Sequence, residues 1–157
     1  MSRTAKLAAI AAASAAAVAM TAAPAAAWPN ADVSGVLSGN MVIDAGVEAT
    51  CTGSTLNGTI DSNGALTITS ASVSGCGVTV TASNLPWSGS FSGSTATING
   101  FRMSAIGCTY GGTLTGSLSG STLPATVTFS DVTVNKISGF FCPGSATVSA
   151  TYVFSEV

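Results

Sequence analysis

The residues of this chain that could do chemistry are four cysteines and six carboxylic acids, and histidine is absent. Without histidine, Ser-His-Asp and Cys-His catalysis and the common zinc hydrolase sites are excluded in their usual forms. Two carboxylates at a suitable separation could still hydrolyse a glycosidic bond, and the acids considered for such a pair are Asp44, Glu48, Asp61 and Asp131. With six acids some nearby pair is expected by chance, and no D-x-D-x-D-G calcium loop is present. We therefore predict no catalytic residue, no metal site and no cofactor.

An internal duplication arranges the four cysteines as two equivalent pairs. Cys51 begins the phrase Cys-Thr-Gly-Ser-Thr-Leu-Asn-Gly-Thr-Ile, and Cys108 begins a second version, Cys-Thr-Tyr-Gly-Gly-Thr-Leu-Thr-Gly-Ser-Leu. Each copy closes on a second cysteine, Cys76 or Cys142. In an exported protein this pattern favours disulfides within the copies, Cys51–Cys76 and Cys108–Cys142, among the three possible connectivities. A zinc site is disfavoured because the close Cys-x-x-Cys spacing is missing.

The beginning of the chain has the pattern of a secretory signal peptide. A short positively charged region is followed by an alanine-rich apolar stretch and then by small residues. We expect cleavage between Ala27 and Trp28, so that residues 1–27 are the signal and residues 28–157 are the mature protein. The predicted localisation is outside the cell or in the cell envelope. No later apolar run reaches the ~20 residues of a transmembrane helix.

The composition of the chain excludes some classes of partner. Charged residues make up only 6% of the chain, and its formal net charge is −2. No basic patch is present, so we expect no nucleic-acid partner. The missing charge is replaced by serine, threonine and glycine around many aliphatic residues, which indicates a folded protein and not a disordered one. We expect one monomeric all-β domain over residues 28–157.

Apolar and polar residues alternate with a period of two after residue 32. Near the end of the chain, for example, Val148, Ala150, Tyr152 and Phe154 alternate with serine, threonine and valine. Because side chains on a strand point alternately to its two faces, this pattern indicates strands with one buried face. Turn signals recur about every ten residues, as in a sandwich or a barrel. The turn signals are Asp61-Ser62-Asn63-Gly64, Asn84-Leu85-Pro86, Asn99-Gly100, Ser119-Gly120-Ser121 and Cys142-Pro143-Gly144.

These patterns predict an all-β fold built from two related halves. We expect a disulfide-stapled β-sandwich or a closed β-barrel of about nine to eleven short strands. The two copies span roughly residues 45–100 and 101–157. In each copy a glycine, Gly58 or Gly116, lies between two inward-facing aliphatic residues. A glycine there would let another backbone or a bulky side chain approach closely.

Three further motifs accompany the cysteines. They are Leu85-Pro86-Trp87, the run Gly107-Cys108-Thr109-Tyr110, and Cys142-Pro143 ahead of Ala146-Thr147-Val148. Together with the Cys-Thr-x-x-Thr-Leu-x-Gly phrase, they resemble a group of small secreted actinobacterial proteins over nearly the whole mature chain, from Cys51 to Tyr152. That group is largely without an assigned activity. The resemblance therefore implies a secreted β domain and adds no catalytic residue.

Three aromatic residues are candidates for a binding surface, namely Trp87 and the pair Phe140 and Phe141 beside Cys142. Trp87 also fits the inward alternation of Phe91, which favours a place in the core. Our preferred hypothesis is an exported, non-enzymatic protein that binds an unknown extracellular or envelope ligand or has a structural role there. The first alternative is a small porin-like β-barrel of a mycolate outer layer, whose lumen would be lined by the hydroxyl side chains. The second is a secreted hydrolase that uses paired carboxylates.

Overall fold

The computed structural model describes residues 27–157, which form strands, turns and loops and no helix. In this part of the chain there is accordingly no helix long and apolar enough to cross a membrane. The predicted signal peptide, apart from its last residue, lies outside the described residues. The strands are β1 (Ala31–Leu37), β2 (Met41–Asp44), β3 (Glu48–Cys51), β4 (Gly53–Ile60), β5 (Ala65–Ser74), β6 (Val80–Ala82), β7 (Trp87–Ser92), β8 (Thr95–Ala105), β9 (Cys108–Ser119), β10 (Ala125–Ser138) and β11 (Ser145–Glu156).

Eight of these strands form a closed barrel. The hydrogen-bonded order is β1, β4, β5, β7, β8, β9, β10 and β11, and β11 pairs back onto β1. All of these pairings are antiparallel. The alternation of the sequence is compatible with a sandwich and with a barrel. The pairing of β1 with β11 establishes the barrel and confirms the predicted all-β, disulfide-stapled fold.

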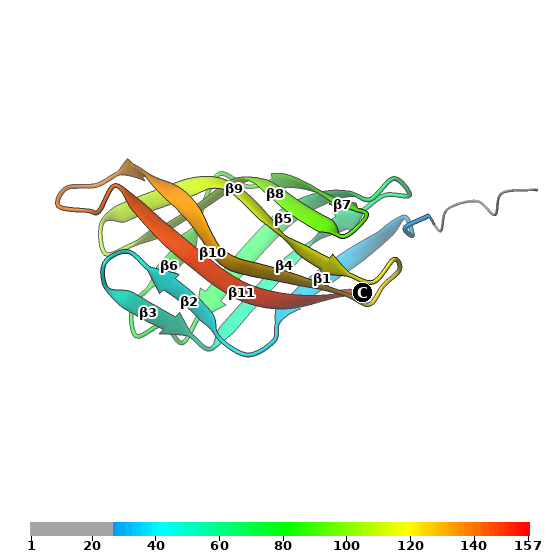
Figure 1. Cartoon of the computed structure of the whole chain (residues 1–157), viewed down its shortest axis with the longest axis horizontal. Coiled ribbons are helices and arrows are strands. Elements are labelled where there is room, and N and C mark those ends of the chain that lie inside the picture. Colours follow the sequence, from blue (N-terminus) through cyan, green and yellow to red (C-terminus); the bar gives the residue numbers. More distant parts are fainter. Residues whose placement is uncertain (1–26) are drawn as a thin grey trace, which may run out of the picture.

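The other three strands extend the barrel at one end. β2 pairs with β11 at Thr147–Ser149, beyond the stretch that pairs with β1, and β3 pairs with β2. β6 pairs with the last part of β8, beyond β7. This end carries the loops 45–47, 75–79, 106–107 and 139–144, and we call it the distal end. The C-terminus and the first described residues lie at the opposite end, the terminal end (Figure 1).

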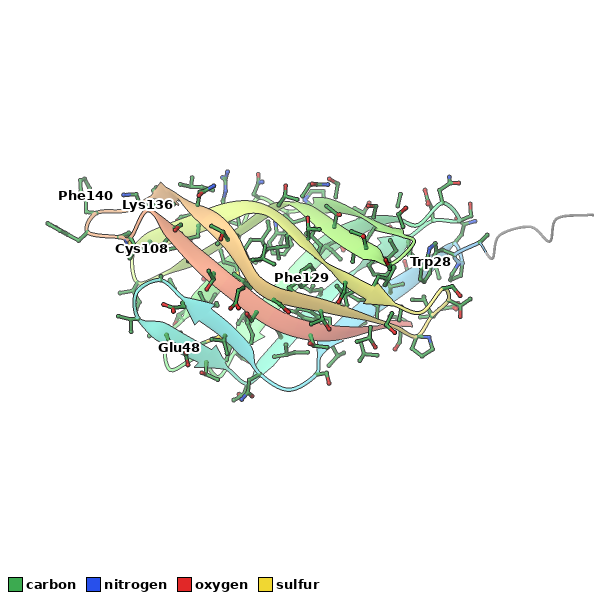
Figure 2. The ribbon with its side chains drawn as sticks, in the orientation of Figure 1. Trp28, Glu48, Cys108, Phe129, Lys136 and Phe140 are labelled. Atoms are coloured by element: carbon green, nitrogen blue, oxygen red, sulfur yellow. A yellow bond between two sulfur atoms is a disulfide. The ribbon has the colours of Figure 1, made fainter. Side chains whose placement is uncertain are left out.

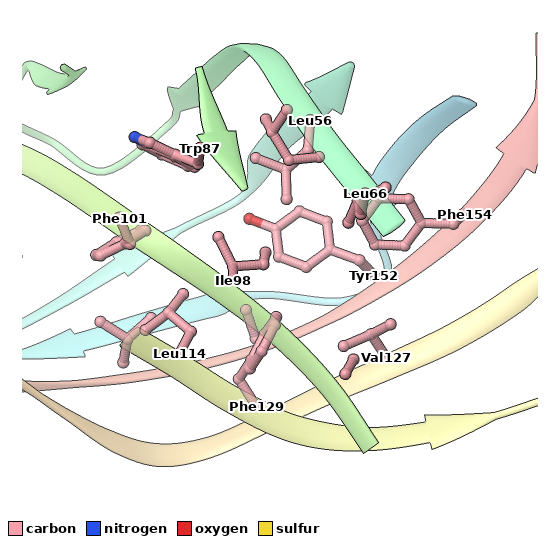
Figure 3. Close-up of a cluster of buried hydrophobic side chains, with 14 of the residues drawn as sticks. Leu56, Leu66, Trp87, Ile98, Phe101, Leu114, Val127, Phe129, Tyr152 and Phe154 are labelled. Atoms are coloured by element: carbon pink, nitrogen blue, oxygen red, sulfur yellow. The ribbon is translucent and has the colours of Figure 1, made fainter. Parts of the chain in front are cut away.

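Apolar side chains fill the interior of the barrel. They form one cluster of buried residues that includes members of all eight barrel strands. Figure 3 shows the aromatic rings of Trp87, Phe129, Tyr152 and Phe154 among aliphatic side chains in this cluster. Most serine and threonine residues of the strands alternate with the buried positions and lie on the outer face, whereas Ser54 is buried. The apolar residues of the alternating pattern therefore face the interior of the barrel.

A bulge in β8 changes which of its side chains face inward. The register with β9 shifts between Ile98 and Phe101, and Gly100 adopts a φ of +75° there. A bulge adds one residue to one strand, and glycine reaches positive φ without steric cost. Ile98 before the bulge and Phe101 and Met103 after it are consequently all buried, although strict alternation would turn the last two outward. The prediction of a turn at Asn99-Gly100 is therefore wrong, because the extra residue is absorbed within one strand.

A second bulge acts in the same way on β10. Its register with β11 shifts between Phe129 and Val132, and Asp131 has a φ of +46°. Phe129 lies before the bulge and Val134 after it, and both are buried. The part of β10 nearest the distal end thereby points Val134 into the barrel. The two bulges together turn Phe101, Met103 and Val134 toward the interior at the distal end.

Two disulfides fasten the distal half of the barrel. Cys51–Cys76 joins the end of β3 to the segment after β5, and Cys108–Cys142 joins the start of β9 to loop 139–144. These are the two pairs that the duplicated phrase favours. The boundary between the predicted copies, at residues 100 and 101, falls inside β8, so both halves contribute to one barrel wall. That the halves arose as copies stays a prediction.

Candidate functional site

Five exposed apolar side chains lie on the distal loops. Val47, Ile106, Phe140 and Phe141 are 82%, 79%, 93% and 107% exposed, and Val78 is 39% exposed. Every one of the four distal loops contributes at least one of them. We call these five residues the apolar rim. Single exposed apolar side chains are ordinary on protein surfaces, but a group of them around one hollow marks a binding site.

The apolar rim lines a groove of about 560 Å³ at the distal end of the barrel. Its floor consists of inward-facing side chains, among them Phe101, Met103, Val134 and Val148. Among residues 27–157, Glu48 is the one charged residue that lines it. The volume lies within the range of small-molecule sites, about 300–1,000 Å³. Because the lining offers so little charge, the groove suits an uncharged, apolar ligand.

Loop 139–144, which carries Phe140 and Phe141, is anchored at its base. The Cys108–Cys142 disulfide joins it to β9, and the Tyr110 hydroxyl donates a hydrogen bond to the Pro143 carbonyl at 3.0 Å. Figure 2 shows Phe140 projecting beyond the end of the barrel, near Cys108 and far from Trp28. The two phenylalanine rings are therefore held out to solvent on a fixed support.

Two members of the apolar rim have a costly backbone conformation. Ile106 has a φ of +51° and Phe141 a φ of +58°. Positive φ is uncommon for residues other than glycine, and a β-branched or bulky residue there is an outlier. The other non-glycine residues with positive φ in the described part of the chain, Asn84 and Asp131, are of the types that tolerate it. Such outliers cluster at functional sites, which supports a role for the rim in binding.

Trp87 lies in the core and not on a binding surface. It is 1% exposed, and its ring packs against Phe101 with 5.1 Å between the ring centroids. Its indole N–H donates a hydrogen bond to the Ser83 carbonyl at 2.8 Å. This is the place that the alternation with Phe91 favours. Of the three aromatic candidates, only Phe140 and Phe141 line the distal groove.

The four candidate carboxylates do not form one site. Asp44 and Glu48 face each other in the β2–β3 pairing, but Asp61 follows β4 at the terminal end. Oδ1 of Asp44 and Oδ1 of Asp61 accept hydrogen bonds from backbone N–H groups of their own turns. Asp131 accepts one from the Ser149 hydroxyl at 3.1 Å. Residues 27–157 contain no group of three or more side chains that could hold a metal ion.

Tyr152 and Ser54 form a polar pair that is buried inside the barrel. Their hydroxyl oxygens are 2.7 Å apart, and Ser54 donates its proton to the Ser72 carbonyl at 2.8 Å. A hydroxyl has one proton to donate, so Ser54 accepts the bond from Tyr152. Burial raises the pKa of Tyr152 to about 12. The phenol is thus buried in the core with its proton engaged by Ser54.

Three rim residues, Val47, Val78 and Ile106, were not among the sequence candidates. Each stands alone in the sequence, far from the other two, so no local motif connects them. They share one feature, because each lies next to a glycine of positive φ in a turn. An apolar residue in a glycine turn, where polar residues are usual, is the signal that could have identified them.

Comparison with known proteins identifies a family for the chain. A family model described as alkane oxidation protein activator PraA/PraB-like matches residues 1–156. No curated protein and no solved structure matches the chain. The cysteine-containing motifs resemble those of an actinobacterial group, but the family match does not indicate from which organisms its members come. Because the match covers nearly the whole sequence, the chain belongs to the PraA/PraB-like family of alkane oxidation protein activators.

Proposed function

We propose that this protein is an exported, non-enzymatic binding protein that takes up alkanes in the distal groove and so supports their oxidation by another protein. The observation that carries the proposal is the groove itself, with its apolar floor and its rim of exposed apolar side chains. The family description names an activator of alkane oxidation, which points to the same class of ligand. An activator acts on a reaction that another protein performs, in keeping with the absence of histidine from this chain.

The chemistry of an alkane determines what its binding site must offer. An alkane has no charge and no hydrogen-bonding group, so its recognition depends on burial of apolar surface, about 0.8 kcal/mol for each CH₂ group. A polar group that the ligand covers without a partner would weaken binding. In the groove, the Tyr110 hydroxyl is already bonded to the Pro143 carbonyl. The floor of Phe101, Met103, Val134 and Val148 offers apolar surface.

Export is part of the proposal and has two kinds of support. The first residues of the chain have the pattern of a signal peptide. All four cysteines are paired in disulfides, which persist in oxidising compartments outside the cytoplasm. An exported protein would meet a poorly soluble alkane before the alkane reaches the oxidising enzyme. We further propose that the protein acts as a monomer.

The two alternative functions receive less support. A porin presents apolar side chains to lipid and polar ones to its lumen, whereas in the described chain the apolar side chains fill the interior. A carboxylate hydrolase needs two cooperating acids. Asp44 and Glu48 are the one pair of the considered acids that lie opposite each other, and Oδ1 of Asp44 is engaged by the Gly46 N–H.

The proposal is tested by displacement of a fluorescent apolar probe. N-phenylnaphthylamine is bound to the purified mature protein and then displaced by n-dodecane. The variants Val47→Asp and Ile106→Asp place a charge at the rim. Val47→Asp should change the free energy of unfolding by no more than about 0.5 kcal/mol, because Val47 is exposed. Ile106→Asp should raise it, because aspartate tolerates the positive φ of this position. Val36→Asp is the matched control, because Val36 is also exposed but lies outside the groove.

We expect both rim variants to weaken binding of n-dodecane by about tenfold, equivalent to ~1.4 kcal/mol, and the control to bind like the unchanged protein. Urea unfolding of all three variants verifies that they are folded. If n-dodecane displaces no probe from the unchanged protein, or if Val36→Asp weakens binding as much as the rim variants do, the groove is not an alkane site. Stimulation of alkane oxidation by cells supplied with each variant should follow the same order as the affinities.

A further inference from the structure

A second, smaller cavity lies inside the barrel beneath the distal groove. It has a volume of about 10 Å³ and is enclosed by core side chains, among them Met41, Leu56 and Trp87. Three residues, Phe101, Met103 and Val148, line both this cavity and the groove. The floor of the groove is therefore part of the wall of the cavity. Figure 3 shows Trp87, Phe101 and Tyr152 around this part of the interior.

The cavity is small and its lining is almost entirely apolar. A volume of about 10–15 Å³ on this measure corresponds to one water-sized sphere. Water needs two to four hydrogen-bonding partners in such a place, but the lining is apolar apart from the Tyr152 hydroxyl, which Ser54 already engages. A methyl group needs no such partner. The cavity thus suits the end of an alkyl chain better than it suits water.

Of the three shared side chains, Met103 is the one that can move aside. Methionine is unbranched, has three rotatable bonds and adapts to irregular gaps. Val148 is β-branched and stiff at its first torsion, and the Phe101 ring packs against Trp87 with 5.1 Å between centroids. Rotation of Met103 would join the groove to the cavity with the least disturbance of the core.

We propose that a linear alkyl chain enters the groove end-on and that Met103 is the gate through which its terminal methyl group reaches the internal cavity. The proposal rests on the proposed alkane-binding function and adds a selectivity to it. A chain end without branches fits past one displaced side chain, whereas a branched end would require Phe101 or Val148 to move as well. The site therefore prefers linear alkanes to branched isomers of equal carbon number.

Trp87 provides a reporter for this path, because it lines the cavity and not the groove. The chain has two tryptophans, so the variant Trp28→Phe leaves Trp87 as the one fluorophore of this kind. Bromine quenches tryptophan fluorescence at short range and is about the size of a methyl group. A terminally brominated n-dodecane is compared with an isomer brominated in mid-chain. Binding of each is measured independently by displacement of N-phenylnaphthylamine.

We expect saturable quenching of Trp87 by the terminal bromide, several times stronger than by the mid-chain bromide. Met103→Phe should remove this quenching, and Met103→Leu, which keeps the volume but adds a branch, should reduce it. Met41→Leu is the matched control, since Met41 lines the cavity but not the groove. In this variant the terminal bromide should quench Trp87 as strongly as in the unchanged protein. In direct competition, n-hexadecane should displace the probe at lower concentration than its branched isomer heptamethylnonane.

The outcomes separate this inference from the function on which it rests. If both bromides displace the probe but neither quenches Trp87, the chain stays in the groove and the gate is refuted, while alkane binding stands. The gate is also refuted if both bromides quench Trp87 equally, or if the terminal bromide quenches Trp87 in the Met103→Phe variant as strongly as in the unchanged protein. If neither bromide displaces the probe, alkane binding itself fails and the inference fails with it.

Discussion

Ile106 combines an exposed apolar side chain with a backbone conformation that is unfavourable for its residue type. It occupies the first position of the two-residue turn between β8 and β9, and its φ of +51° is followed by +74° at Gly107. A type I′ turn requires positive φ at both positions and strongly favours Asn-Gly. Isoleucine is β-branched and among the least suited residues for this conformation. Its side chain is 79% exposed, so packing in the core does not explain its presence.

Ile106→Asn is therefore expected to stabilise the fold and to weaken binding. Asparagine tolerates the left-handed conformation, so the free energy of unfolding should rise by roughly 1 kcal/mol. The same change removes an apolar side chain from the rim, and the affinity for n-dodecane should fall. Urea unfolding and probe displacement on the same protein samples measure the two effects. A variant that is more stable and binds n-dodecane unchanged would show that the isoleucine has no part in binding.

Tyr152 leads to a prediction about alkaline pH. Its pKa is about 12 in the folded protein, because burial disfavours the phenolate, and 10.0 is the ordinary value. Below about pH 10 the proton is bound in both states and the contribution to stability is fully present. Between about pH 10 and 12 the unfolded chain loses the proton first, so the free energy of unfolding should fall by roughly 3 kcal/mol in total.

The control for this pH dependence is Tyr152→Phe, which removes the titrating group and leaves Ser54 its bond to the Ser72 carbonyl. Urea unfolding of both proteins at pH 9 and at pH 11.5, within the window set by the two pKa values, measures the difference. The unchanged protein should lose more stability than Tyr152→Phe over this interval. Equal losses in the two proteins would mean that another group causes the alkaline decline.

At the scale of the strand, glycine determines how closely neighbouring elements approach. Gly116 of β9 lies on the inward side between Leu114 and Leu118, as the duplicated phrase predicts. A Cβ atom added at Gly116 would lie 2.7 Å from Cδ1 of Phe129. The expectation that another backbone or a bulky side chain approaches this glycine closely is confirmed, since the same Cβ atom would lie 2.5 Å from the Thr128 carbonyl oxygen. Gly58, its counterpart in β4, is closely approached by the backbone of β5 instead.

Gly116→Ala should destabilise the protein by about 1–3 kcal/mol, because the added methyl group displaces Phe129 or the adjacent carbonyl of Thr128 in a packed interior. Gly144→Ala is the matched control, since nothing lies within 4 Å of a Cβ atom built there. Thermal and urea unfolding of the two variants measure the difference. Destabilisation of the same size in both variants would mean that a loss of glycine flexibility, and not the contact with Phe129, is responsible.

The strands show how far the sequence is predictive and where it is not. The alternation of apolar and polar residues identifies β11 and the early part of β10, because every second side chain of a straight strand faces the same side. The alternation fails at the bulges, since an added residue exchanges the inward-facing and outward-facing positions, and no change in the apolar residues marks this in the sequence. Phe101, Met103 and Val134 face inward for this reason alone. Asn99-Gly100 has the composition of a turn, and only pairing with β9 shows that β8 continues through it.

At the scale of the whole molecule, the closed barrel brings together residues that the sequence keeps apart. Val47, Val78, Ile106 and Phe140 belong to four different loops, and antiparallel pairing places all four loops at one end. The disulfide pairs are predictable because the duplication groups the cysteines. The groove is not predictable from the sequence, because it depends on closure of the barrel and on the bulges. Acids lie at both ends, Asp32, Asp61 and Glu156 at the terminal end and Asp44 and Glu48 at the distal end, so the apolar rim and not the acids distinguishes the distal end.

The position of the apolar rim at the distal end predicts a role for the rings of Phe140 and Phe141 in binding. Both rings are almost fully exposed, so the double variant Phe140→Ser/Phe141→Ser should change the free energy of unfolding by no more than about 0.5 kcal/mol. If they cover a ligand that occupies the groove, the same variant should bind n-dodecane about tenfold more weakly, or ~1.4 kcal/mol.

Val36→Ser/Val157→Ser removes two apolar side chains that are also exposed but lie away from the groove. Equal weakening in both double variants would mean that n-dodecane adsorbs to apolar surface in general. A loss confined to the distal variant would mean that the barrel binds alkane at one end only. In that case the anchored loop 139–144 is the part of the fold that presents the rings to the ligand, because the disulfide to Cys108 and the bond from Tyr110 hold its base in place.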